Sequence, residues 1–123
     1  MLLVDAANVV GARADGWWRD RPGAAGRLVA ELRGAVASGR LDPPVVVVLE
    51  GAARPGAPQA DEGGVRVVHA PGSGDDTLAS LAAASGPGDE RVVLVTADRA
   101  LRARAAAVGA SLAGPTWLLD RLG

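Results

Sequence analysis

Four short apolar runs in the sequence are each followed by acidic residues. Asp5 follows residues 2–4, Glu50 follows residues 45–49, the pair Asp75-Asp76 comes in the turn after residues 65–70, and Asp98 follows residues 92–96. Short continuous apolar runs are typical of strands that are covered on both faces, as in a parallel sheet. Because parallel strands point their carboxyl ends the same way, we expect these acids to gather along one edge of the sheet, where such folds place their sites.

Helical spacing of apolar residues alternates with these runs. We expect helices over residues 24–37, from Asp75 or Asp76 to about Ser85 with Gly86-Pro87-Gly88 as its stop, over residues 98–108 and over residues 115–122, and a last strand over residues 110–113. Residues 6–10 read as a tight turn, and the Gly/Pro-rich residues 51–64 as a linker.

This alternation predicts an α/β fold, a three-layer doubly wound parallel sheet with helices on both faces. Right-handed crossovers restrict the topology, and we favour the strand order 3-2-1-4-5. In that order the first strand lies beside the fourth, so Asp5 and Asp98 become neighbours at the point where the strand order reverses.

Composition limits the class of protein. A chain of 123 residues, 49% of them hydrophobic, is long enough for one core and too short for two, so we expect a single domain over residues 1–123. Cysteine is absent, which excludes disulfides and thiolate zinc sites. No segment resembles a signal peptide or a membrane span, so we expect no membrane partner and a cytoplasmic location. The formal net charge of −1 argues against binding of nucleic acid by bulk electrostatics.

Clustered carboxylates either raise one another's pKa or bind a cation, and hard oxygen ligands suit Mg²⁺ or Mn²⁺. The competing interpretation is structural, because Asp75, Asp76 and Asp98 lie where helices start and an Asp at an N-cap stabilises a helix by about 1 kcal/mol. Capping does not explain two adjacent acids, and it explains Asp5 poorly if a tight turn follows. A divalent-metal site is therefore the first hypothesis.

Three motifs, in chain order, resemble the NYN (YacP-like) branch of the PIN-domain nucleases. Residues 4–11 (VDAANVVG) resemble its opening strand and turn, of the form Asp-x-x-Asn. Residues 73–78 (SGDDTL) resemble its second acidic motif at a helix start, and residues 95–99 (VTADR) resemble its third, in which a Thr or Ser precedes an Asp. The resemblance covers nearly the whole chain and implies the PIN-like form of this fold and a metal-dependent (endo)ribonuclease.

Carried over by position, the resemblance implies a metal site and a reaction. It makes Asp5, Asp75 and Asp98 metal-binding acids, with Asp76 the second choice at the acidic pair and Glu50 a further ligand at the end of the second strand. Mg²⁺ or Mn²⁺ is the implied cofactor. The implied reaction is hydrolysis of an RNA phosphodiester, in which the metal lowers the pKa of a bound water and neutralises charge on the phosphate.

Two polar residues complete the implied catalytic set. Asn8 is expected to hold the first turn and to hydrogen-bond toward a metal-bound water or the substrate phosphate. Thr96 is expected to orient Asp98 or a water. The full catalytic set is then Asp5, Asn8, Asp75, Asp76, Thr96 and Asp98.

The loop after the first motif suggests substrate contacts. Residues 13–21 (RADGWWRDR) combine two Trp with three Arg, in the way that single-stranded RNA binders stack bases and hold phosphates. The substrate-binding candidates are Arg13, Trp17, Trp18, Arg19 and, after Asp98, Arg99. The competing interpretation is that a Trp covers the end of a helix as a hydrophobic plug. RNA, single-stranded or ribosome-associated, is the expected partner.

Two other classes of function stay open. A metal-dependent nucleotide pyrophosphohydrolase would use the same carboxylates, but such enzymes usually carry several Glu on helices, and this chain has four scattered singly. A catalytically weak RNA-binding or toxin-type module of the same fold is equally compatible with a short domain that has an acidic edge. The apolar residues 117–119 fit both closure of the core and docking of a partner, so a homodimer also stays open.

Overall fold

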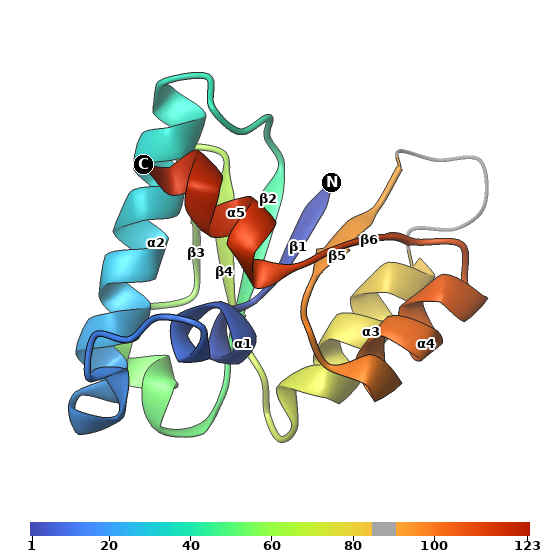
Figure 1. Cartoon of the computed structure of the whole chain (residues 1–123), viewed down its shortest axis with the longest axis horizontal. Helices are drawn as coiled ribbons and strands as arrows, with labels where there is room; N and C mark the ends of the chain where they lie inside the picture. Colours follow the sequence, from blue (N-terminus) through green and yellow to red (C-terminus); the bar gives the residue numbers. More distant parts are fainter. Residues whose placement is uncertain (85–90) are drawn as a thin grey trace.

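The computed structural model describes residues 1–84 and 91–123, within which six strands form one sheet with helices on both faces (Figure 1). The strands are β1 Leu2–Asp5, β2 Val45–Leu49, β3 Ala60–Glu62, β4 Val65–His69, β5 Val93–Val95 and β6 Ser111–Ala113. The helices are α1 Ala6–Gly11, α2 Arg21–Ala37, α3 Gly74–Ala84, α4 Arg99–Ala107 and α5 Pro115–Leu122. Two 3₁₀ helices, η1 Trp17–Arg19 and η2 Gly51–Gly56, lie in the connections.

The sheet has the order β3-β4-β2-β1-β5-β6. Its parallel part, from β4 to β6, is the predicted order 3-2-1-4-5, so the predicted α/β fold is confirmed. The central strand β1 pairs with β2 on one side and β5 on the other, with Val4 opposite Val47 and Val95. The predicted end of α3 at Ser85 and its stop at residues 86–88 lie outside the described residues.

Alternate residues of each buried strand face two different layers of helices. Val4 and Val47 pack with α1, α2 and α5, whereas Leu3 and Val46 pack with α3 and α4 on the other face. In the described part of the chain, every buried hydrophobic residue is Val, Leu or Ala, as the low aromatic content requires. Within residues 1–84 and 91–123, no helix is long and apolar enough to cross a membrane.

The last helix, α5, closes the first of these two layers. Leu118 is completely buried, and Trp117 and Leu119 pack against the same core cluster. The guanidinium of Arg121 lies 4.0 Å from the ring centroid of Trp117. The apolar residues of α5 therefore contribute to the core of this chain.

The segment 51–64 is not the predicted linker. It forms η2 and the edge strand β3, which pairs antiparallel with β4 and makes the sheet mixed. Gly63 and Gly64, both with positive φ, form the two-residue loop between β3 and β4. A Gly-Gly pair is a known hairpin signal, but the Ala-Asp-Glu sequence of β3, in which the two acids are exposed, has no apolar alternation to mark a strand.

The predicted tight turn at residues 6–10 is also wrong, because these residues form α1. Val9 and Val10 are buried in α1, and the carboxylate of Asp5 caps the helix by accepting a hydrogen bond from the backbone N–H of Asn8 at 3.3 Å. A helix of six residues is marginal alone, so packing of its apolar face stabilises it. Capping therefore explains part of the role of Asp5 after all.

η2 packs closely on α2 because both contribute glycine at the contact. A Cβ on Gly56 would overlap the carbonyl oxygen of Pro22 and lie 3.0 Å from the Cβ of Ala25. A Cβ on Gly26 would lie 2.9 Å from the carbonyl oxygen of Gly56. The contact fixes η2 beside the end of β2.

The same substitution is expected to have opposite effects at two glycines. Gly56→Ala should lower the free energy of unfolding by about 1–3 kcal/mol, because the new methyl group meets backbone that cannot yield. Gly34→Ala, at an exposed position of α2 where a Cβ meets nothing within 4 Å, should raise it by about 0.5–1 kcal/mol. Urea unfolding measures both, and an unchanged or raised free energy of unfolding in Gly56→Ala would contradict the close η2–α2 contact.

Candidate functional site

Four carboxylates from separate segments gather at the carboxyl end of the parallel strands. Asp5 ends β1, Glu50 follows β2, Asp75 lies in the first turn of α3, and Asp98 precedes α4. Asp5 lies within electrostatic reach of Asp75 and Glu50, and Asp75 within reach of Asp98 and Glu50. The fold thus brings together the acids that the sequence predicts at this edge.

Asp5 is the buried member of the group, with 4% of its surface exposed. Burial is the main cause that raises the pKa of its carboxyl, and the charges of Asp75 and Glu50 raise this pKa further. Hydrogen bonds from Thr96 and from the backbone of Asn8 act in the opposite direction. Burial and the neighbouring charges outweigh these hydrogen bonds, so the ionised carboxylate is held in an unfavourable place.

A hydrogen-bond network joins β1 to the loop after β5. The hydroxyl of Thr96, fully buried, donates to Oδ2 of Asp5 at 2.8 Å and accepts from the backbone N–H of Asp98 at 3.1 Å. Oδ1 of Asn8 accepts from the backbone N–H of Ala97 at 2.9 Å. Thr96 therefore orients Asp5 as well as the backbone at Asp98. Asn8 holds the loop after β5, which carries Thr96 and Asp98.

The two adjacent acids of α3 have different surroundings. Asp75 is partly buried, and its pKa is raised first by burial and then by the charges of Asp98 and Glu50, while Arg104 lowers it. Asp76 is exposed and its carboxylate lies 3.0 Å from the guanidinium of Arg104 on α4. Asp75 belongs to the carboxylate group, and Asp76 joins α3 to α4.

Gly74 explains the position of Glu50. The backbone N–H of Gly74 donates to Oε2 of Glu50 at 2.8 Å, and a Cβ at this position would lie 3.1 Å from the Glu50 carboxylate. A side chain at position 74 would therefore displace the Glu50 carboxylate by a few tenths of an ångström. Glu50 is thereby held against the first turn of α3, next to Asp75.

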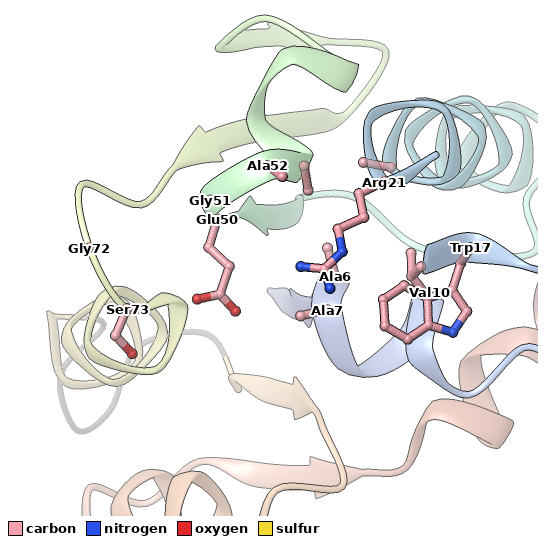
Figure 2. Close-up of a pocket in the computed structure, with 12 residues that line it drawn as sticks. Ala6, Ala7, Val10, Trp17, Arg21, Glu50, Gly51, Ala52, Gly72 and Ser73 are labelled. Atoms are coloured by element: carbon pink, nitrogen blue, oxygen red, sulfur yellow. The ribbon is translucent and has the colours of Figure 1, made fainter. Parts of the chain in front are cut away.

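A pocket of about 500 Å³ opens beside Glu50, between α1, α2, η2 and residues 72–73. Figure 2 shows the guanidinium of Arg21 and the carboxylate of Glu50 pointing into it from opposite sides, with Trp17 next to Val10 on the α1 side. Much of the remaining lining is alanine, from α1 and η2. Arg21 was not among the predicted substrate-binding residues, because its position in a run of Arg and Trp does not show which side chains face the site.

Two of the predicted substrate-binding residues, Arg13 and Arg99, have different surroundings. Arg13 forms two hydrogen bonds of 2.7 Å to the carboxylate of Glu31 on α2, and these raise the pKa of Arg13. Arg99 is exposed at the start of α4, directly after Asp98. The guanidinium of Arg13 is thus engaged within the fold, whereas Arg99 lies at the rim of the carboxylate group.

Trp17 and Trp18 also differ. Trp17 packs against the core and lines the pocket, whereas Trp18 is 57% exposed and meets Trp17 edge to face with centroids 6.0 Å apart. Arg19 lies 5.7 Å over the ring of Trp18, and Arg21 lies 5.5 Å over the ring of Trp17. The loop therefore forms two Trp–Arg pairs, of which the pair of Trp17 and Arg21 lines the pocket.

The donor chemistry of the carboxylate group fits a hard divalent cation, because all four side chains offer carboxylate oxygens. In residues 1–84 and 91–123, no three His, Asp or Glu side chains are close enough together, as they stand, to hold a metal ion.

Comparison of the structure with known proteins supports the fold. A crystal structure of Rae1 (YacP) from Bacillus subtilis superposes with a TM-score of 0.78 and 21% sequence identity, over 99% of this chain and 72% of that one. A mutant form of the same protein gives a TM-score of 0.67 and 22% identity, over 98% and 72%. The sequence matches no family model and no curated protein. The PIN-like, YacP-type fold that the three motifs imply is confirmed.

Removal of the Thr96 hydroxyl is expected to destabilise the site. Thr96→Val keeps the shape of the side chain but leaves the buried Asp5 carboxylate with one donor fewer, which should lower the free energy of unfolding by about 1.5–3 kcal/mol at neutral pH. Thr96→Ser keeps the hydroxyl and should retain most of this contribution. An unchanged free energy of unfolding in Thr96→Val, measured by urea unfolding, would contradict a contribution of the hydrogen bond to Asp5.

Proposed function

We propose that this protein is a metal-dependent ribonuclease that hydrolyses phosphodiester bonds in RNA with Mg²⁺ or Mn²⁺. The observation that carries the proposal is the buried Asp5 carboxylate, which lies within electrostatic reach of Glu50 and Asp75, with Asp98 in turn within reach of Asp75. A buried carboxylate is unfavourable unless it is paired or binds a metal, and such perturbed groups are concentrated at functional sites.

The four carboxylates are the proposed metal ligands. Each oxygen of Asp5 accepts one hydrogen bond within the protein, and a carboxylate offers about four acceptor sites, so Asp5 keeps capacity for a cation. A divalent ion bound there supplies an activated water and neutralises charge on the phosphate. Asn8 and Thr96 contribute by fixing Asp5 and the loop that carries Asp98.

Histidine does not serve as a general base in this proposal. The ring of the single histidine, His69, donates from Nε2 to the carbonyl oxygen of Ala57 at 2.6 Å, and so ties the end of β4 to the residue after η2. The carboxylates themselves therefore carry the chemistry. The YacP-type fold and the three acidic motifs are the reason to prefer RNA over nucleoside triphosphates as the substrate.

Single substitutions at the carboxylates should abolish RNA cleavage. In millimolar Mn²⁺ with labelled single-stranded RNA, Asp5→Asn and Asp75→Asn should each reduce the rate at least about a hundredfold, more than outer-shell partners of a metal usually do. Asp76→Asn should lose much less, because the Asp76 carboxylate pairs with Arg104 outside the group. Asp61→Asn, which makes the same change on the exposed edge strand β3, is the matched control and should retain the wild-type rate.

The same assay distinguishes the other classes of function. Nucleoside triphosphates and duplex RNA are tested in parallel with the single-stranded substrate. Hydrolysis of triphosphates without cleavage of RNA would replace the proposal with a pyrophosphohydrolase. RNA binding without any metal-dependent cleavage would reduce the protein to a binding module of this fold.

A further inference from the structure

The pocket beside Glu50 is large enough for a small ligand. Its volume of about 500 Å³ lies within the range of small-ligand sites, and one wall is shared with the carboxylate group through Glu50. The remaining wall combines one aromatic ring, one cation and alanine side chains from α1, α2 and η2. An apolar surface with a few polar groups is typical of a site for a flat, partly polar ligand.

Arg21 supplies the cation of this pocket. Its guanidinium points into the cavity in Figure 2. Across the described parts of the chain, no carboxylate or carbonyl group forms an ion pair or hydrogen bond with Arg21, and its contact is the ring of Trp17 at 5.5 Å. This contrasts with Arg13, whose guanidinium is engaged by Glu31. Arg21 is therefore available to bind an anion, and the planar guanidinium suits a phosphate group.

Trp17 supplies the aromatic surface. It packs against the core on one side and lines the pocket on the other, so the ring is held in place before any ligand arrives. A fixed ring loses little conformational freedom on binding and is a suitable platform for stacking of a base. Trp18, 57% exposed and outside the pocket lining, lacks this support.

The wall of the pocket that η2 forms is also held in place by packing. Ala52 and Ala53 belong to η2, which the close contact between Gly56 and α2 holds against the residues around Ala25. The pocket is therefore formed by the fold and not by a mobile loop alone. Alanine at these positions leaves space in the pocket that larger side chains from η2 would fill.

We infer that this pocket binds one unpaired nucleotide of an RNA strand, with its base against Trp17 and a phosphate on Arg21, next to the phosphate at the carboxylate group. The inference rests on the proposed function and adds a substrate preference to it. A base in a duplex is stacked on both faces and paired, so it enters such a pocket only after it leaves the helix. The pocket therefore selects single-stranded over double-stranded RNA.

Binding can be measured without catalysis. A short fluorescent single-stranded RNA is titrated with protein in the presence of EDTA, and the dissociation constant is read from anisotropy. Trp17→Ala should weaken binding about fivefold or more, the lower limit for loss of one stacked base. Arg21→Ala should weaken binding by a similar factor, because a charge-assisted contact to the phosphate is lost. Trp17→Phe keeps an aromatic ring and Arg21→Lys keeps the charge, so both should lose less than the Ala variants.

Matched controls test where the contact lies. Arg27→Ala removes the same charge from an exposed position of the same helix and should bind as the wild type does. Trp18→Ala should lose less than Trp17→Ala, and an equal or larger loss would place the base on the exposed ring and overturn the pocket assignment. Circular dichroism and the unfolding free energy of each variant show whether it is folded, and the Trp17→Phe variant keeps the test valid if Trp17→Ala does not fold.

Two further ligands, duplex RNA and AMP, test whether the pocket binds a nucleotide of a single strand, of a duplex or in free form. The same sequence in a duplex should bind more weakly than the single strand, and AMP should bind more weakly still while depending on the same two residues. Binding of AMP without binding of the strand would overturn the assignment to RNA. Equal binding of duplex and single strand would also overturn it.

The outcome of this experiment is separable from that of the cleavage assay. Cleavage that depends on Asp5, together with RNA binding that is indifferent to Trp17 and Arg21, would leave the nuclease and remove the pocket. Binding that depends on both residues, with no cleavage by the wild type, would leave the pocket and remove the nuclease.

Discussion

Burial of the Asp5 carboxylate, beside the negative charges of Glu50 and Asp75, is the constraint on which the site depends. Burial and neighbouring negative charge raise the pKa of Asp5 and Asp75, so the folded state binds protons more tightly than the unfolded state. Such groups lower the stability of the folded state once they ionise. The free energy of unfolding therefore falls as the pH rises from the ordinary Asp pKa through the raised one, and the cost is fully present above the raised pKa. A bound cation would offset this cost, which is the physical argument for a metal site.

Contacts from several segments of the fold fix the acids in place. Thr96 and the backbone of Asn8 hold Asp5, and the glycine at position 74 holds Glu50 against α3. Since these contacts come from β1, the loop after β5 and the start of α3, the group forms only when the parallel sheet is complete. The pocket with Arg21 is attached to the same framework through Glu50, so positive and negative groups face one another across it.

The sequence was sufficient for the parallel strands and for the acids at their ends, because continuous apolar runs mark buried strands and strand order follows from right-handed crossovers. The sequence was insufficient for the short elements whose formation depends on tertiary packing. The helix α1 depends on burial of Val9, the strand β3 depends on its hairpin with β4, and both are too short to show a pattern. Likewise, a run of alternating Arg and Trp does not reveal that Arg21 faces the pocket while Arg13 pairs with Glu31.

The most direct test of this account is a calorimetric titration of Mn²⁺ into the metal-free protein at neutral pH, with Asp5→Asn and Asp61→Asn alongside. The account predicts saturable binding at millimolar Mn²⁺ or below in the wild type and in Asp61→Asn, and binding at least about tenfold weaker in Asp5→Asn, the scale of effect expected when support for a metal ligand is lost. Absence of binding to the wild type, or equal binding to Asp5→Asn, would contradict a metal centre at these carboxylates.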